Sequence, residues 1–244
     1  MKRIWKIVLI VVVVLLVFAA IGFIYLYNNG LSGQYANKEA KDGQIKVACV
    51  GDSVTYGHGI SGWKENNYPA QLQVILGEGY HVANFGSSGA CVNPDGDQPY
   101  VSRAVYQESL AYEADILVFM LGTNDSKPEN WTDAESFMKD YKELLNSYLT
   151  GTHRPSKIYV GLCAECYFTD DATEGMTNFD IQPAIVDEIV EEIAAYFENY
   201  EATVKMIDVH SLTEAHPEWF EKDGVHPNND GARGIAELVA QEIQ

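Results

Sequence analysis

The sequence predicts an α/β protein, a three-layer α/β/α sandwich with a five-stranded parallel sheet, preceded by a single membrane-spanning helix. Three observations lead to this prediction. A long uncharged apolar run begins the chain, five short apolar runs rich in β-branched residues follow it, and an amphipathic stretch of helical length comes after each of the five. Strands and helices that alternate in this way form a parallel sheet covered by helices on both faces.

The apolar run at the start of the chain covers residues 7–27 and carries no charge, which makes it long enough to cross a hydrocarbon core of about 30 Å. Lys2, Arg3 and Lys6 precede it, so the positive-inside bias places the N-terminus in the cytoplasm and the rest of the chain outside. A cleaved signal peptide is the alternative, but its apolar part usually has only about 7–15 residues. We therefore expect residues 1–29 to be a cytoplasmic stub and an uncleaved membrane anchor, and both interpretations export the rest.

A polar segment separates this anchor from the part of the chain that has strand and helix patterns. Residues 28–44 contain three glycines and show no apolar periodicity, which is typical of a flexible tether. We therefore predict a linker over residues 30–44 and one folded domain over residues 45–244.

The chain after residue 29 is strongly acidic. It holds all 35 acidic residues but only 13 of the 16 lysines and arginines, which gives it a formal charge of −22. Such a charge disfavours nucleic acid and anionic lipid head groups as ligands. Solubility is the simplest role for this acidity, and the charge alone identifies no substrate.

The repeating pattern supplies five strands and five helices, too few for a closed barrel of eight such units. Strands are predicted at residues 45–50, 80–85, 115–121, 157–162 and 203–208. Helices are predicted at residues 67–77, 101–113, 134–149, 182–200 and 229–243. Ligands of open parallel sheets bind beyond the carboxyl ends of the strands, so the residues just after each strand are the candidates for a functional site.

A possible nucleophile follows the first predicted strand, in the tripeptide Gly51-Asp52-Ser53. Gly51 permits a sharp turn, and Ser53 then falls at or near a helix start, where a hydroxyl is exposed to the positive end of the helix dipole. A helix-capping role is the simple alternative for such a serine. The tripeptide alone is weak evidence, and the prediction depends on the loops that follow.

Two further loops offer hydrogen-bond donors for an oxyanion. After the second strand, Gly86 can turn its backbone N–H toward an oxyanion with no side chain in the way. After the third strand, the side-chain amide of Asn124 can supply a second donor to the same oxyanion. Taken singly, each of these residues is an ordinary turn residue.

A carboxylate and an imidazole lie close together near the C-terminus, in Asp223-Gly224-Val225-His226. A loop this short can hold the Asp223 carboxylate against one ring nitrogen of His226 while the other nitrogen faces Ser53, as a catalytic triad requires. The remaining histidines lack a comparable arrangement, and we interpret them as surface or structural residues, although His58 is near Ser53 in sequence. They are His58, His81, His153, His210 and His216.

The chain contains four cysteines, Cys49, Cys91, Cys163 and Cys166, and an exported domain allows disulfides to persist. Their pairing cannot be read from the sequence. Cys163 and Cys166 have the spacing of a redox or zinc half-site, but no second pair of cysteines or histidines at ligand spacing accompanies them. We therefore predict no metal site.

Together the four loops resemble the conserved blocks of the SGNH hydrolases, also called the GDSL esterase and lipase family, which centre on Ser, Gly, Asn and His. The resemblance covers about residues 45–243. It implies Ser53 as nucleophile, His226 as base and Asp223 as its partner, with the Ser53 N–H, Gly86 and Asn124 as the oxyanion hole. It also implies a flavodoxin-like fold and no metal or organic cofactor.

Four stretches are also similar to a bacterial branch described as sialate O-acetylesterase-like or acetylxylan-esterase-like. They are IKVACVGDSVTYG, NFGSSGA, MLGTNDSKPENW and HPEWFEKDGVHPN. This branch and the outward location favour a small acyl group, acetyl, carried on a carbohydrate. Trp63, Trp131, Tyr167 and Phe168 are candidates for stacking on sugar, with core packing expected for at least two of them. Residues 164–182 match no pattern of the family, so substrate preference depends most on that region.

Three other functions remain open from the sequence. A lipase or lysophospholipase would use the anchor to hold its active site near lipid. An acyltransferase would pass the acyl group to a sugar hydroxyl instead of water, and sequence does not separate it from a hydrolase. A noncatalytic glycan-binding surface protein is disfavoured by the complete set of Ser53, Asp223 and His226. The sequence does not set the oligomeric state.

Overall fold

The computed structural model describes residues 2–28, 35, 37–151, 153–169, 175–177, 179–198, 200 and 203–244. The predicted strands are β1 (Ile45–Gly51), β2 (Tyr80–Gly86), β3 (Ile116–Met120), β4 (Lys157–Gly161) and β5 (Val204–Ile207). The predicted helices are α4 (Tyr68–Leu76), α5 (Ala104–Ala111), α6 (Ala134–Leu149), α7 (Pro183–Phe197) and α9 (Asn229–Ile243). Shorter elements that the sequence did not predict are α2 (Ser53–Tyr56), α3 (Trp63–Asn66), α8 (Val209–Glu214) and the 3-10 turns η1 (Tyr100–Ser102), η2 (Thr123–Ser126) and η3 (Pro217–Trp219).

The five strands form one parallel sheet in the order β2-β1-β3-β4-β5, which confirms the predicted fold class. Gly51 pairs with Gly86 on one side and with Met120 on the other, so the carboxyl ends of β1, β2 and β3 meet at one edge. The chain passes from β1 outward to β2 and then back across β1 to β3, so the strand order reverses beside β1. This is the place where open sheets of this kind bind ligands.

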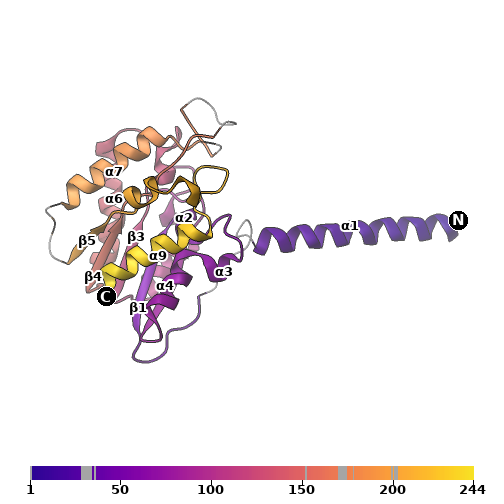
Figure 1. The fold of residues 1–244 in the computed structure, drawn as a ribbon, viewed down its shortest axis with the longest axis horizontal. Coiled ribbons are helices and arrows are strands. Elements are labelled where there is room, and N and C mark those ends of the chain that lie inside the picture. The colour runs from indigo at the N-terminus through magenta and orange to yellow at the C-terminus, as the bar shows by residue number, and fades with distance from the viewer. Residues whose placement is uncertain are drawn as a thin grey trace.

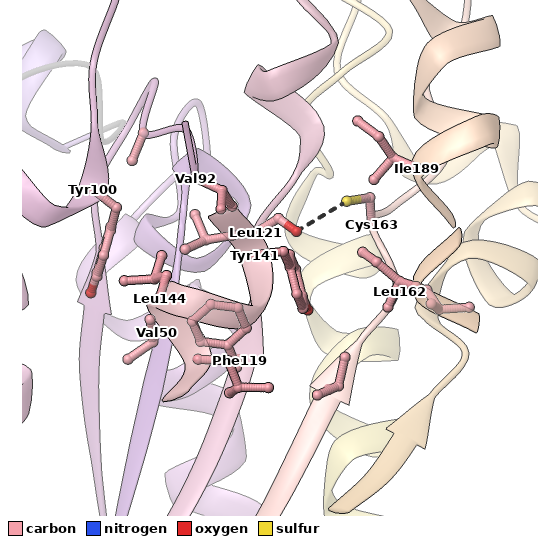
Figure 2. Packing of buried hydrophobic residues seen from close by; sticks show 14 of the residues in the cluster. Val50, Val92, Tyr100, Phe119, Leu121, Tyr141, Leu144, Leu162, Cys163 and Ile189 are labelled. Carbon is pink, nitrogen blue, oxygen red and sulfur yellow. Dashed lines mark hydrogen bonds between the residues drawn. The ribbon is translucent and has the colours of Figure 1, made fainter. Parts of the chain in front are cut away.

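Helices cover both faces of the sheet (Figure 1). Along β1, Ala48 and Val50 pack into the core cluster that contains side chains of α6 and α7, whereas Val47 and Cys49 pack into the cluster under α4 and α9. Burial on both faces explains why the strands are nearly continuous apolar runs in the sequence. Figure 2 shows part of the first cluster, in which Phe119 and Tyr141 pack edge to face with their ring centroids 5.2 Å apart.

A single helix, α1 (Lys2–Asn28), projects away from the domain (Figure 1). Its segment Val8–Tyr27 has a mean hydropathy of 3.2 and is not buried against the domain. By length and composition this helix can cross a membrane, and a signal sequence has the same properties. Residues 1 and 29 of the predicted anchor segment and residues 30–34 and 36 of the predicted linker lie outside the described residues.

Candidate active site

Strand β1 ends at Gly51 and places Ser53 in the first turn of α2. A Cβ atom on Gly51 would lie 2.0 Å from Oγ1 of Thr55, so only glycine fits at this turn. Asp52 caps the helix, since its carboxylate accepts a hydrogen bond of 2.9 Å from the backbone N–H of Val54. The hydroxyl of Ser53 is thereby held at the edge of the sheet, with only 6% of the residue exposed.

Ser53, His226 and Asp223 form a continuous hydrogen-bonded chain. The distance from His226 Nε2 to Ser53 Oγ is 2.9 Å, and the distance from His226 Nδ1 to Asp223 Oδ2 is also 2.9 Å. Because an ionised carboxylate can only accept, Nδ1 carries the ring proton and Nε2 accepts from the serine hydroxyl. The structure thus brings the three predicted residues together in the order that general-base activation of a serine requires.

The carboxylate of Asp223 is fixed by its own loop. Its second oxygen, Oδ1, accepts hydrogen bonds of 2.9 Å from the backbone N–H groups of Val225 and His226. Burial raises the pKa of Asp223. His226, through its hydrogen bond and charge, and the two backbone donors lower this pKa by more, so the pKa of Asp223 lies below its usual value. This carboxylate is therefore ionised and oriented at neutral pH.

Gly86 does not take the predicted role of oxyanion donor. Its backbone N–H donates to Oδ1 of Asn84 at 2.9 Å, so this donor is already engaged. A Cβ atom on Gly86 would lie 2.2 Å from the backbone nitrogen of Tyr56. The prediction is therefore wrong for this residue: Gly86 is needed for the close packing of β2 against α2.

The next glycine of the same loop, Gly89, lines the pocket beside Ser53, His226 and Asn124. Gly89 adopts a φ of +79°, and its N–H has no hydrogen-bond partner among the described residues. Asn124 donates one amide hydrogen to the carbonyl oxygen of Ala90 at 3.1 Å, which orients the amide and leaves its second hydrogen available. The backbone N–H of Ser53 is also available, because it lies in the first turn of α2.

Buried polar groups hold the turn that carries Asn124. Asn130 donates from its side chain to the backbone oxygen of Asn124 at 2.8 Å. The next residue, Asp125, is 1% exposed and accepts hydrogen bonds of 2.9 Å from the N–H groups of Val92 and Asn93. Burial raises the pKa of Asp125 to about 7 even though these bonds oppose the rise. Asp125 thus links the loop after β2 to the loop after β3.

A pocket of about 430 Å³ opens beside the Ser53 hydroxyl. One side of it is polar, with Lys127 and Asp97 joined by an ion pair of 3.0 Å. The apolar side includes Phe179, whose ring centroid lies 5.1 Å from that of His226 at an angle of 84°. Phe179 belongs to the region 164–182 that matched no family pattern, and residues 170–174 and 178 of that region lie outside the described residues.

A second imidazole lies against the first. The ring centroids of His58 and His226 are 4.4 Å apart, with the rings tilted by 42°, and His58 also lines the pocket. Burial, together with the nearby His226, lowers the pKa of His58 to about 4, while Asp223 opposes this effect. His58 is therefore neutral near pH 7. The sequence feature that pointed to His58 as a site residue was its closeness to Ser53 along the chain.

The structure does not bring the four aromatic candidates into this pocket. Trp63 is 1% exposed and packs within the core, which excludes stacking on a sugar and corrects that prediction. Trp131 lines a separate pocket of about 320 Å³, and Tyr167 packs against Phe220 with ring centroids 5.0 Å apart. Phe168 is 61% exposed. Among the residues described around Ser53, Phe179 is the aromatic ring that a substrate would meet.

All four cysteines are free and buried. Cys163 points its sulfur at the carbonyl oxygen of Leu121 at 3.6 Å (Figure 2). Burial raises the pKa of Cys49, Cys91 and Cys163 to about 12, and it raises the pKa of Cys166 as well. These thiols are therefore protonated at neutral pH. Since redox exchange and metal binding need a thiolate, the four cysteines serve as packing groups.

A serine hydroxyl joined through an imidazole to a carboxylate, at the edge of an α/β sheet, is the arrangement that defines serine hydrolases as a class. The chain belongs to the GDSL-like lipase/acylhydrolase family, whose model matches residues 49–233. This confirms the family resemblance. An acetylxylan esterase of Xylanibacter ruminicola is 34% identical, over 84% of this chain and 44% of that protein, so the chain spans less than half the length of this relative.

Solved structures share the fold at lower identity. A carbohydrate acetylesterase from Sinorhizobium meliloti matches with a TM-score of 0.64 and 19% identity, over 82% of this chain and 98% of that chain. An aryl esterase of M. smegmatis matches with a TM-score of 0.64 and 17% identity, over 82% and 98% of the two chains. A family 3 carbohydrate esterase from Talaromyces cellulolyticus matches with a TM-score of 0.59 and 19% identity, over 82% and 96%.

Proposed function

We propose that this protein is a serine esterase that removes small acyl groups, acetyl foremost, from carbohydrates. The observation that carries the proposal is the hydrogen-bonded chain from Asp223 through His226 to Ser53, which ends at an open pocket. Membership in the GDSL-like lipase/acylhydrolase family supports ester chemistry at this site.

The geometry supports a two-step mechanism. His226 Nε2 takes the proton of the Ser53 hydroxyl as Oγ attacks the ester carbonyl, and the imidazolium is stabilised by Asp223. The N–H groups of Ser53 and Gly89 and the Asn124 amide are the donors for the oxyanion. His226 then protonates the leaving alcohol, and an acyl group remains on Ser53. Water attacks this acyl-enzyme with His226 again as base, which releases the acid and restores the serine.

The character of the pocket supports a polar substrate with a small acyl group. Asp97, Lys127, Glu129 and Asp180 all line it, and few apolar side chains accompany them. A long alkyl chain would have to desolvate these charged groups without replacing their hydrogen bonds. The names of the Xylanibacter and Sinorhizobium proteins, an acetylxylan esterase and a carbohydrate acetylesterase, suggest the same class of substrate.

Hydrolysis of p-nitrophenyl esters from acetate to palmitate by the full-length chain tests the proposal. We expect the highest kcat/KM with acetate, and Ser53→Ala at background. Ser156→Ala, an exposed serine before β4, is the matched control and should retain wild-type activity. Equal activity in Ser53→Ala and wild type refutes the assignment of Ser53 as the nucleophile. A preference for palmitate over acetate supports a lipase. Acyl transfer to an added sugar in place of release as acid would support an acyltransferase.

We also propose that residues 1–29 anchor the protein in the membrane with the N-terminus in the cytoplasm, and that the linker 30–44 carries the catalytic domain 45–244 outside. The apolar segment Val8–Tyr27 and the basic residues before it support this topology. An outward domain would meet extracellular glycans directly. Protection of the domain from protease added to intact cells would contradict this orientation.

A further inference from the structure

Three potential ligand side chains from separate parts of the chain meet on one side of the domain. Glu165 follows β4, Asp187 lies on α7 and His210 lies on α8, and their nearest ligand atoms all lie within 4.8 Å of one another. His210 Nε2 is 3.3 Å from Glu165 Oε2 and 3.7 Å from Asp187 Oδ1. In a tetrahedral zinc site with bonds of about 2.0–2.1 Å, neighbouring ligand atoms are roughly 3.3–3.4 Å apart. The two distances from His210 are close to this spacing.

The orientation of His210 points to a ligand atom. Its Nδ1 lies 3.2 Å from the carbonyl oxygen of Cys163, which can only accept, so Nδ1 carries a proton. Nε2 is left facing the two carboxylates. A histidine that ligates a metal through one nitrogen characteristically donates its other N–H to a carbonyl or carboxylate in this way.

The side chains of His210 and Glu165 approach each other without a hydrogen bond between them. The Glu165 oxygen Oε2 is 3.3 Å from Nε2, and among the described residues no hydrogen bond joins the two side chains. Nε2 and the two carboxylates therefore face one another as three potential ligand groups.

The carboxylate of Glu165 is held by groups outside the cluster. Its Oε1 accepts from the backbone N–H of Cys166 at 2.8 Å, while its own backbone N–H donates to Oγ1 of Thr213 at 2.9 Å. The side chains of Glu165 and His210 are each 14% exposed, whereas Asp187 is 55% exposed. Two ligands are thus fixed in position, and the third is open to solvent and gives an ion a path of entry.

We propose that Glu165, Asp187 and His210 bind one divalent transition-metal ion of the zinc type, with water in the fourth position. An imidazole with two carboxylates suits Zn²⁺ better than Ca²⁺ or Mg²⁺, which take oxygen ligands in larger number. The site differs from the Cys163 and Cys166 pair that the sequence spacing suggested. It is independent of the esterase mechanism, in which these three side chains take no part.

The bound ion would link the loop after β4 to α7 and α8, close to the catalytic loop. Two residues after Glu165, the backbone N–H of Tyr167 donates to the carbonyl oxygen of Gly224 at 2.7 Å. Gly224 lies between Asp223 and His226 in sequence. The ion would therefore stabilise the segment that supports Asp223 and His226, without touching the substrate.

Zinc binding to the full-length, EDTA-treated chain in detergent tests the proposal by isothermal titration and thermal unfolding. We expect one equivalent of Zn²⁺ to bind, and we expect Zn²⁺ at about 100 times its Kd to raise Tm by roughly 5–10 °C. Glu165→Gln, Asp187→Asn and His210→Ala should each bind at least about tenfold more weakly. His216→Ala is the matched control, because His216 pairs with Glu218 at 2.9 Å on the exposed surface.

Two results would overturn the proposal. One is the absence of stoichiometric Zn²⁺ binding by the wild-type chain. The other is binding that Glu165→Gln and His210→Ala leave unchanged, or that His216→Ala removes. Should His210→Ala fail to fold, Co²⁺ added to the wild-type chain gives a separate answer. Visible absorption bands of tetrahedral Co²⁺, displaced by one equivalent of Zn²⁺, support the site, and their absence counts against it.

Discussion

Replacing Asp223 by asparagine should disable the catalytic base without removing a hydrogen bond. Oδ1 of Asp223 accepts from two backbone N–H groups, those of Val225 and His226, so an oxygen must stay at that position. The new NH₂ group of Asp223→Asn is then forced to the position of Oδ2, 2.9 Å from His226 Nδ1. An NH₂ group donates, so Nδ1 must accept and the ring proton moves to Nε2. His226 can then no longer accept the proton of Ser53.

The size of the effect follows from this change of tautomer. The corresponding carboxylate-to-amide replacement in a serine protease lowers kcat by about 10⁴, which is roughly 5.4 kcal/mol of transition-state stabilisation. Asp223 does not line the substrate pocket among the described residues. We therefore expect kcat to fall by about 10⁴ while KM changes little.

Steady-state hydrolysis of p-nitrophenyl acetate at pH 7.5 measures this loss, with Ser53→Ala as the background. Asp208→Asn is the matched control, because Asp208 caps α8 by accepting from the Ser211 N–H, and asparagine caps a helix equally well. That variant should retain wild-type activity. If Asp223→Asn lost less than about tenfold in kcat, the role of this carboxylate in setting the tautomer would be refuted.

Four further predictions concern other parts of the molecule. Asn124→Ala should lower kcat by about 10²–10³ because it removes an oxyanion donor, and a loss below about tenfold in the same assay would contradict that role. Gly86→Ala should lower Tm by roughly 4–8 °C, because its Cβ would meet the Tyr56 backbone at 2.2 Å. Gly79→Ala is the control, since the space around its Cβ is open and Tm should not change. Equal melting temperatures for the two variants would refute the packing argument. Because burial and the nearby His226 hold the folded-state pKa of His58 near 4, below its ordinary value, His58 should cost the folded protein about 1–2 kcal/mol of stability as pH falls from 7 to 4.5, after allowance for its partial exposure. Urea unfolding of His58→Gln should show a smaller loss over this range, and parallel pH profiles for both chains would argue against it. Finally, mass spectrometry of the membrane fraction should find residues 1–29 still joined to the domain, and recovery only of a soluble chain that lacks them would show that the N-terminal segment is cleaved.

Local sequence patterns predicted the sheet well because its strands are buried on both faces. The run at 157–162, for example, became β4 over Lys157–Gly161. The helix predicted at 101–113 was less accurate, since α5 covers only Ala104–Ala111 and the 3-10 turn η1 precedes it. The reason is tertiary: the buried Tyr100 donates its hydroxyl hydrogen to the carbonyl oxygen of Phe85 at 2.7 Å, which sets the backbone at this point.

Some contacts of the candidate site likewise follow from residues that are close in sequence, and others depend on tertiary packing. Asp223 and His226 lie three residues apart, so short-range geometry predicted their contact. The contact of His226 with Ser53, 173 positions away, was predicted from the place of each loop at one end of the sheet and from the family resemblance. Gly86 ends β2 and Gly89 lies in the loop after it. The Gly86 N–H donates to the side-chain oxygen of Asn84, whereas the Gly89 N–H has no partner among the described residues. The contact of His58 with the catalytic imidazole depends on packing between distant loops, which spacing along the chain does not reveal.

The distance along the chain between nucleophile and base has a consequence for biosynthesis. Ser53 and His226 are 173 positions apart in the sequence. The strands β2, β3, β4 and β5 lie between them along the chain and must all enter the sheet before the two residues meet. A nascent chain that has just emerged already carries its serine but has no base to activate it. The proposed esterase activity can therefore begin only after synthesis has passed His226 and the five strands have assembled, so molecules that end before His226 would remain inert toward esters.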